Sequence, residues 1–270
     1  MPIAVHTSNQ ESNYRFFVRL ADGRALLSCH AQNAVLIVDC GGAVVGKVEP
    51  MALFAKPEGI AIDSKGCIFI VDRHNNCIHV LDQHLVHLRS MITAHQPIGR
   101  LNQPVGIAVS PKDGRIWVAD NENHRVVALT ENGWHSATLG SGYGTAPGQL
   151  FCPCGVAIYD QPDYGELIVV SEWGGGRVQV FEAATGNVFA IFGGVPHAHH
   201  VVVDKEGIMF VSEYSSKRIK RFSIDGNWRS GCEESAVSLV AGDDGLAMVV
   251  TPTRVVVEDG DGKTKRKRGG

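Results

Sequence analysis

The sequence has no apolar run that approaches the ~20 residues a helix needs to span a bilayer. Its polar opening, His6 to Asn13, is not the apolar centre of a secretory signal peptide. A helical pattern is also missing, because no stretch of three or more turns shows a convincing apolar stripe. We therefore expect a β protein without membrane association, located in the cytoplasm, with the nucleus as the alternative compartment.

Cysteines are few and scattered. There are seven, an odd number, and only Cys152 and Cys154 lie close together. A lone Cys-x-Cys pair lacks the spacing of a structural zinc site, and an odd, dispersed set does not indicate a disulfide framework. We expect reduced thiols, as in cytosolic and nuclear proteins, and no cofactor.

Familiar catalytic motifs are missing as well. The sequence contains no G-x-S-x-G elbow, no P-loop and no H-E-x-x-H pair. The glycine-rich segment from Gly140 to Gly144 leads into an expected strand, so it has no helix dipole with which to bind phosphate. We expect no catalytic residues and favour a protein that is not an enzyme.

Acidic residues are absent from the C-terminal end. The last eight residues contain five bases and no acid, and without those five the chain has 20 Lys and Arg against 28 Asp and Glu, a formal charge of −8. A body of that charge repels polyphosphate. We expect residues 261–270 to form a basic, disordered tail, and a nuclear-localisation or nucleic-acid-binding signal stays open there.

The chain does contain one pattern six times. Each copy has an apolar run, an acidic turn that ends in glycine, a second apolar run that ends on an acid, a polar loop and a third apolar run. The turn glycines follow one another at intervals of 43, 48, 51, 42 and 38 residues, and they are Gly23, Gly66, Gly114, Gly165, Gly207 and Gly245. These intervals match the length of one four-stranded propeller blade.

The repeats predict an all-β fold, a six-bladed β-propeller of four-stranded antiparallel blades. Residues 1–260 are expected to form this single domain as a monomer, because the repeats leave no room for a second domain. The last repeat supplies only three strands, at 237–241, 246–251 and 254–258. We predict that Pro2 to Thr7 adds the fourth strand and closes the ring, which would remove a sheet edge.

The unit P-x-G-I-A-V-x5-G-x-I-x-V-A-D-x-x-N-x-R-V-x-x-L resembles the NHL repeat. The match is strongest at 104–129 and good at 57–81, and most of the chain keeps the frame. The resemblance implies a propeller fold and leaves the ligand open. NHL propellers serve as protein-binding modules, as RNA-binding domains of the tripartite-motif proteins, as bacterial sensor domains and as the zinc-dependent lyase that completes peptide amidation.

Two segments resemble that lyase more closely. They are PHAHHVVVD from Pro196, where the lyase carries a zinc histidine, and FCPCGVAI from Phe151. The alternating histidines His197 and His199 could place Nε2 atoms on one metal ion, with His74 or His124 from another blade completing a three-histidine zinc site. The other ligand-bearing blades of the lyase begin with His, whereas the corresponding blades here begin with Pro-Glu-Gly and Pro-Val-Gly.

Comparison of the repeats separates scaffold from candidate site, because residues found in every blade are expected to hold the fold. An acid recurs where the second run ends and an arginine where the third begins, so we predict ion pairs that hold the loop between them. These residues are Asp72, Asp120, Glu172 and Glu213, with Arg125, Arg177 and Arg218.

The loop residues between these positions differ from blade to blade. A propeller brings such loops to one face, around the mouth of its central channel, and aromatic and arginine side chains on a polar surface are typical of binding hot spots. The predicted binding face comprises Arg73, His74, Asn75, Asn121, Asn123, His124, Trp173, His197, His199, Tyr214, Ser215 and Lys217.

We predict from this face a non-enzymatic binding or scaffold propeller for a protein or peptide partner. An RNA-binding propeller of the tripartite-motif type is the alternative, since Arg73, Trp173 and Tyr214 could contact single-stranded RNA, although Glu58 and Glu122 dilute the positive charge. A zinc-dependent lyase or hydrolase with histidines at the channel mouth is the second alternative.

Overall fold

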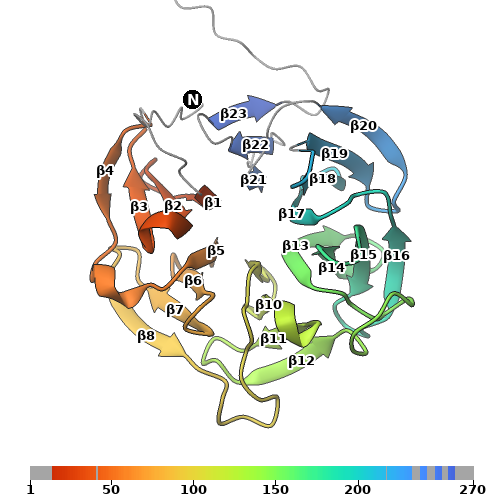
Figure 1. The fold of residues 1–270 in the computed structure, drawn as a ribbon, viewed down its shortest axis with the longest axis horizontal. Coiled ribbons are helices and arrows are strands. Elements are labelled where there is room, and N and C mark those ends of the chain that lie inside the picture. Colours follow the sequence, from red (N-terminus) through yellow and green to blue (C-terminus); the bar gives the residue numbers. More distant parts are fainter. Residues whose placement is uncertain are drawn as a thin grey trace, which may run out of the picture.

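A computed structural model describes residues 14–40, 42–216, 218–232, 238–241, 247–250 and 255–258. Its strands form sheets arranged in a ring around a central channel (Figure 1). None of the helices among these residues is long and apolar enough to cross a membrane. The repeat pattern therefore predicted the class of fold correctly.

Five sheets have four antiparallel strands each, paired in chain order. The first is β1 (Tyr14–Arg19), β2 (Ala25–Cys29), β3 (Ala34–Val38) and β4 (Val44–Lys47). The second is β5 (Pro57–Ile62), β6 (Ile68–Asp72), β7 (Cys77–Leu81) and β8 (His87–Met91). The third is β9 (Ile107–Val109), β10 (Ile116–Asp120), β11 (Arg125–Leu129) and β12 (His135–Leu139).

The fourth sheet is β13 (Pro153–Gln161), β14 (Gly165–Glu172), β15 (Arg177–Glu182) and β16 (Val188–Phe192). The fifth is β17 (Ala198–Val203), β18 (Ile208–Glu213), β19 (Arg218–Ser223) and β20 (Trp228–Cys232). Three short 3-10 helices lie in the connections, at His30–Gln32, Met51–Leu53 and Asn121–Asn123.

The prediction of six four-stranded blades was wrong in number. Five blades have four strands, and the remaining sheet has three among the described residues: β21 (Ser238–Ala241), β22 (Ala247–Val250) and β23 (Val255–Glu258). The physical reason is compositional, because residues 259–270 contain only Gly, Asp, Lys, Thr and Arg and offer no further β-forming run. The predicted closing strand, Pro2 to Thr7, lies outside the described residues.

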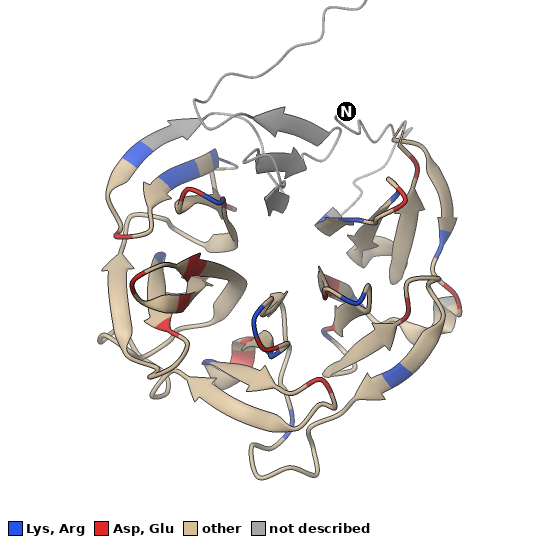
Figure 2. Cartoon of the chain, turned by 180° about the vertical axis from the view of Figure 1, so that it is seen from behind, with Lys and Arg blue, Asp and Glu red and all other residues tan. Residues whose placement is uncertain are grey.

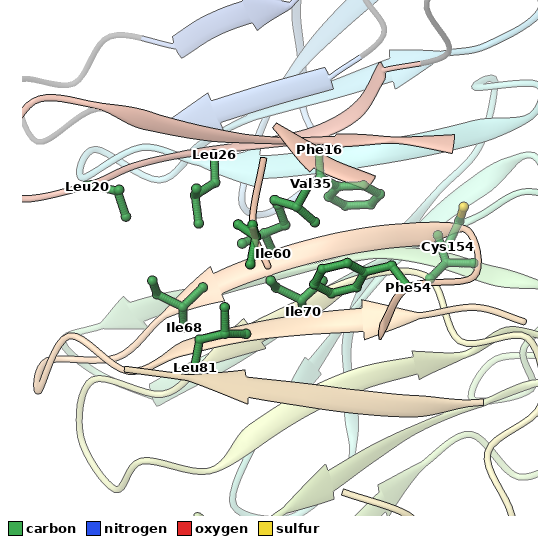
Figure 3. Packing of buried hydrophobic residues seen from close by; sticks show 12 residues of the cluster. Phe16, Leu20, Leu26, Val35, Phe54, Ile60, Ile68, Ile70, Leu81 and Cys154 are labelled. Atoms are coloured by element: carbon green, nitrogen blue, oxygen red, sulfur yellow. The ribbon is translucent and has the colours of Figure 1, made fainter. Parts of the chain in front are cut away.

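Apolar side chains fill the space between neighbouring blades. Leu26 and Val35 of the first blade pack with Ile60 and Ile70 of the second, and Phe54 lies in the same cluster (Figure 3). The second strand of each of the first four blades is buried on both faces, except for the first residue of β14. Burial on both faces explains why these strands read as continuous apolar runs in the sequence.

Glycine allows adjacent innermost strands to touch. A Cβ atom on Gly59, Gly106 or Gly155 would lie 2.5, 2.3 or 2.7 Å from a backbone oxygen of the next blade. The close approach permits a hydrogen bond from the Gly59 N–H to the Val105 oxygen at 3.0 Å. The repeated P-x-G motif is thus explained by contact between blades, and it directs the residue before each glycine toward the channel.

Candidate functional site

The recurring acids hold the loops in place, as predicted. Asp120 and Glu172 are fully buried and lie 2.7 Å from Nε of Arg125 and Arg177. Each carboxylate also accepts a hydrogen bond from the chain that enters the innermost strand, Asp120 from the Asn102 N–H at 2.6 Å and Glu172 from the Phe151 N–H at 2.8 Å. These acids therefore belong to the scaffold rather than to a binding site.

Two blades vary this arrangement. In the second blade Cys77 stands opposite Asp72, and Nε2 of His79 lies 3.2 Å from that carboxylate instead. In the fifth blade Glu213 pairs in register with Arg218, and Nζ of Lys220 lies 3.3 Å from the Glu213 carboxylate. In all four blades that have an acid at this position, a cationic side chain or an imidazole faces that acid.

One residue per blade, at the position before the repeated glycine or its equivalent, surrounds the channel. We call this set the inner ring: Arg15, Glu58, Val105, Cys154 and His199. Every member except Glu58 lines a cavity of about 470 Å³. The scaffold repeats at this position, but the five side chains are all different.

A second set lies closer to solvent, at the position directly after the end of each second strand. We call it the loop ring: His30, Arg73, Asn121, Trp173 and Tyr214. All but His30 line the same cavity, together with Glu122 and Cys152. The two rings therefore form the walls of one cavity at the channel mouth.

Backbone hydrogen bonds fix the loop ring. The N–H groups of Arg73, Trp173 and Tyr214 donate to the oxygens of Lys56, Cys152 and His197 at 3.2, 3.0 and 3.2 Å. Those three acceptor residues have positive φ, where the chain turns into the innermost strand. These three blades thus present their variable side chains from a backbone that is hydrogen-bonded to the chain entering the innermost strand.

A buried carboxylate organises the polar side of the cavity. Glu58 is fully buried, with Nε2 of His30 at 2.9 Å and a terminal nitrogen of Arg73 at 3.4 Å from its Oε1. Burial works to raise the pKa of Glu58, but the hydrogen bond from His30 and the charge of Arg15 outweigh it, so this pKa lies below its ordinary value. Nε of Arg73 also donates to Oε1 of Gln103 at 3.0 Å, which fixes the guanidinium.

Aromatic rings form the opposite side. The rings of Trp173 and Tyr214 are 4.9 Å apart between centroids, and His199 lies 5.8 Å from Trp173 in an edge-on arrangement. The Arg15 guanidinium carbon is 5.7 Å from the centre of the Tyr214 ring. Burial lowers the pKa of His199 to about 4, so its ring is neutral at neutral pH.

The cavity brings together five residues of the predicted binding face: Arg73, Asn121, Trp173, His199 and Tyr214. Asn121 is buried and donates from Nδ2 to the Pro153 oxygen at 2.8 Å. Trp173 is partly buried and packs against the cluster that contains Val105 and Cys154. The most suggestive side chain of the sequence thus faces the channel rather than lying wholly in solvent.

The other predicted residues do not line this cavity. Asn75 and Asn123 turn back to the scaffold acids, donating to Asp72 and Asp120 at 2.9 and 2.8 Å. His124 is also bonded to the scaffold, because its Nδ1 accepts a hydrogen bond from the Cys152 N–H at 3.2 Å.

The remaining three described residues of the predicted face are exposed. His197 and Ser215 are hydrogen-bonded to each other through Nδ1 and Oγ, and His74 lies at the surface. Lys217 lies outside the described residues.

The repeat comparison missed most of the inner ring. Of its members only His199 was predicted as a binding residue; Glu58 was expected on this face only as a charge that weakens RNA binding, and Arg15, Val105 and Cys154 were not among the predicted binding residues. The sequence does indicate this position: in the P-x-G motif the proline and the glycine repeat from blade to blade, whereas the residue between them varies. Arg15 was hidden because its blade has Phe16 where the second, third and fourth blades have glycine.

The described residues do not by themselves form a zinc centre. His197 and His199 were the candidate ligands, and no three His, Cys, Asp or Glu side chains of the described chain converge in a way that could hold a metal ion. His199 is buried against Trp173 and Tyr214, and His197 bonds to Ser215. The two histidines are therefore engaged with neighbouring side chains rather than arranged as a ligand set.

Comparison with known proteins agrees with the repeat pattern. The family described as NHL repeat matches residues 54–81 and 101–129. The chain contains NHL repeats. Outside these two matched repeats the propeller is recognised from its strand order rather than from the family pattern.

Two curated proteins show what an NHL-repeat chain of this kind resembles. It is 29% identical to the peptidylglycine alpha-amidating monooxygenase of Rattus norvegicus over 167 residues, which are 57% of this chain and 16% of that protein. It is 23% identical to the "Probable peptidyl-alpha-hydroxyglycine alpha-amidating lyase" of Caenorhabditis elegans over 231 residues, 79% of this chain and 62% of that protein. This chain spans less than two thirds of either relative.

Solved structures share the fold of these NHL repeats. The virginiamycin B lyase from Staphylococcus aureus superposes with a TM-score of 0.70 at 14% identity, over 98% of this chain and 87% of that one. A chain of the nidogen/laminin complex superposes with a TM-score of 0.68 at 14% identity, over 82% and 80%. At these identities the likeness shows the fold alone.

Proposed function

We propose that this chain is a non-enzymatic binding propeller that holds a protein or peptide partner at the channel mouth. The observation that carries the proposal is the meeting of the inner ring and the loop ring around one cavity, at positions where every blade differs. The positions that repeat are occupied by scaffold hydrogen bonds. A surface that varies on a fixed frame is the usual design of a recognition site.

The size and composition of the cavity support this proposal. Its volume of about 470 Å³ falls within the roughly 300–1,000 Å³ of ligand pockets. Trp173, Tyr214, Arg73 and Arg15 are of the residue types that dominate interface binding energy. Because the loop backbone is hydrogen-bonded in place, little ordering of the loops would accompany binding.

Selection from a displayed random peptide library tests the proposal. The immobilised protein should enrich peptides whose affinity falls by at least about tenfold in the Trp173→Ala variant. Trp134→Ala is the matched control, because Trp134 is 65% exposed in the turn between β11 and β12, away from the cavity. Selected peptides that bind the Trp173→Ala variant as well as the unaltered protein would refute it.

An RNA ligand is a competing outcome that the charges disfavour. Arg73, Trp173 and Tyr214 supply a cation and two aromatic rings, but Glu122 lies beside them and Glu58 beneath. Acidic and basic residues are mixed around the described part of the ring (Figure 2). Filter binding with single-stranded RNA pools at low and moderate salt decides between the two, since backbone-driven affinity falls steeply with salt.

A lyase is the second candidate, favoured by the amidating enzymes among the relatives. It predicts stoichiometric zinc in protein purified without a histidine tag, with loss of the metal in the His199→Ala variant. Metal-free protein that still binds selected peptides would remove this candidate and leave the binding proposal standing.

A further inference from the structure

The charges in the cavity cancel. Arg15 and Arg73 bring two positive charges, and buried Glu58 and lining Glu122 bring two negative ones. His199 adds none at neutral pH, because its pKa is lowered to about 4. A charged ligand group would lose its hydration on entering this space without meeting net opposite charge. The cavity therefore favours an uncharged group.

The surfaces that remain are aromatic, apolar and guanidinium faces. Trp173 and Tyr214 stand 4.9 Å apart, and Val105 and Cys154 supply apolar contacts deeper in the channel. Arg15 already lies over the Tyr214 ring, which shows that a guanidinium and an aromatic ring meet here. Arg73 is held by Glu58 and Gln103, so its position is fixed before any ligand arrives.

We infer that this cavity binds an uncharged aromatic side chain, that of Phe, Tyr or Trp, presented by a peptide segment of the partner. The inference rests on the proposed function and names the chemistry of the group that the site takes. An aromatic ring can form two kinds of favourable contact here. It can stack on Trp173 and Tyr214, and it can lie over or under the guanidinium groups in a cation–π interaction. An aliphatic side chain of equal size would gain only the burial.

The volume fits one such side chain with part of its backbone. At about 470 Å³ the cavity falls within the roughly 300–1,000 Å³ of pockets that enclose whole small-molecule ligands, which leaves room for one aromatic side chain. Glu122 is an exposed residue that lines the cavity, and its carboxylate can accept a hydrogen bond from the peptide backbone or from a tyrosine hydroxyl.

The test varies one position of a selected peptide. An alanine scan first identifies the peptide residue whose loss is coupled to Trp173→Ala, and that residue is then replaced by Phe, cyclohexylalanine, Leu, Lys and Glu. We expect Phe to bind roughly two- to tenfold more tightly than cyclohexylalanine, which has the same shape without the π electrons. Lys and Glu should bind at least about tenfold more weakly than Phe.

Variants of the protein combine with these peptides in a double-mutant cycle. Arg73→Met keeps the aliphatic stem and removes the guanidinium, so the preference for Phe over cyclohexylalanine should shrink. If the Arg73→Met variant does not fold, Tyr214→Leu replaces it: this exposed position supplies a stacking surface, and its loss should also reduce the preference for Phe over cyclohexylalanine. Arg89→Met is the control, because Arg89 is an exposed residue of β8 whose NH2 group bonds to the Glu131 oxygen.

The outcomes separate the two claims. If no selected peptide depends on Trp173, the proposed function fails and this inference fails with it. If peptides depend on Trp173 but their anchor is Lys or Glu, or cyclohexylalanine binds as well as Phe, the binding function stands and the aromatic anchor is refuted.

Discussion

At the scale of single residues, Glu58 is the unusual member of the cavity. It is a fully buried carboxylate whose pKa lies below its ordinary value, yet only Oε1 faces His30 and Arg73. Its Oε2 has no hydrogen-bond partner within the described part of the chain. An ionised carboxylate in this state stabilises its cationic neighbours, although one of its own oxygens lacks a hydrogen bond.

Glu58→Gln should therefore destabilise the protein. The substitution removes the negative charge beside Arg73 and Arg15 while keeping the shape, and a loss of about 1–3 kcal/mol in the free energy of unfolding is expected. Urea denaturation measures it, with Glu122→Gln at the edge of the cavity as the control that should change stability little. Equal effects of the two substitutions would show that Glu58 is not electrostatically coupled.

Two buried histidines predict a dependence of stability on pH. Burial lowers the pKa of His199 to about 4 and that of His200 well below 6.5. The unfolded chain binds protons on these side chains near pH 6.5, so stability present above that pH is lost as the pH falls toward 4. For His199 the loss is about 1.4 kcal/mol per pH unit within this window.

Urea midpoints at pH 7 and pH 5 test this linkage. His199→Phe keeps a buried ring without a proton to gain, so its midpoint should fall less between the two pH values than that of the unaltered protein. His84→Gln, at an exposed position, should leave the pH dependence as it is. A dependence unchanged in His199→Phe would contradict the assignment.

Which of the loop side chains line the cavity could be read from the sequence where position alone decides the direction of a side chain. Arg73, Trp173 and Tyr214 follow a strand-ending acid, and in these three blades that position opens onto the channel mouth. It failed for Asn75 and Asn123, because a short amide can bend back to the acid three residues earlier. Their direction depends on where the carboxylate lies in three dimensions, which the sequence pattern does not contain.

At the scale of strands, contact between the innermost strands governs how tightly the ring closes. Gly106 lies where a Cβ atom would be 2.3 Å from the Cys154 oxygen and 2.9 Å from the Val156 nitrogen. Both neighbours are backbone atoms, so a methyl group can be accommodated only if two blades move apart.

Gly106→Ala should cost about 3 kcal/mol or more in the free energy of unfolding, since overpacking against backbone has no side-chain relief. Gly193→Ala is the matched control, because a Cβ atom there meets nothing within 4 Å. Both are measured by urea denaturation. If Gly106→Ala were as stable as Gly193→Ala, the tight strand contact would not exist in solution.

The sequence predicts the strands themselves well, for a physical reason. The first apolar run of a repeat is followed by a turn that ends in a glycine with positive φ, such as Gly66 or Gly114, and those turns set the hairpin register. The three strands expected in the last repeat are present, each within one or two residues of its predicted bounds. What the pattern could not determine is the pairing of an outermost strand from another part of the chain.

At the scale of the whole molecule, closure of the ring depends on the three-stranded sheet. β21 packs against both β1 and β17, so this sheet lies between the first and fifth blades (Figure 1). The order β21-β22-β23 leaves one side of β23 without a partner among the described strands. An unpaired edge is a site for another strand to add.

The sequence predicts that strand at residues 2–7, and their deletion tests the prediction. If they pair with β23, the deletion removes a ladder of backbone hydrogen bonds at the point where the ring closes. The melting temperature should then fall by several degrees, since about 1 kcal/mol shifts it by roughly 2–4 °C in a chain of this size. Deletion of the basic residues 263–270 is the control, and it should leave the melting temperature unchanged. If both deletions leave melting unchanged, the chain closes without its N-terminal segment; if only the first lowers it, the two ends of the sequence complete one blade.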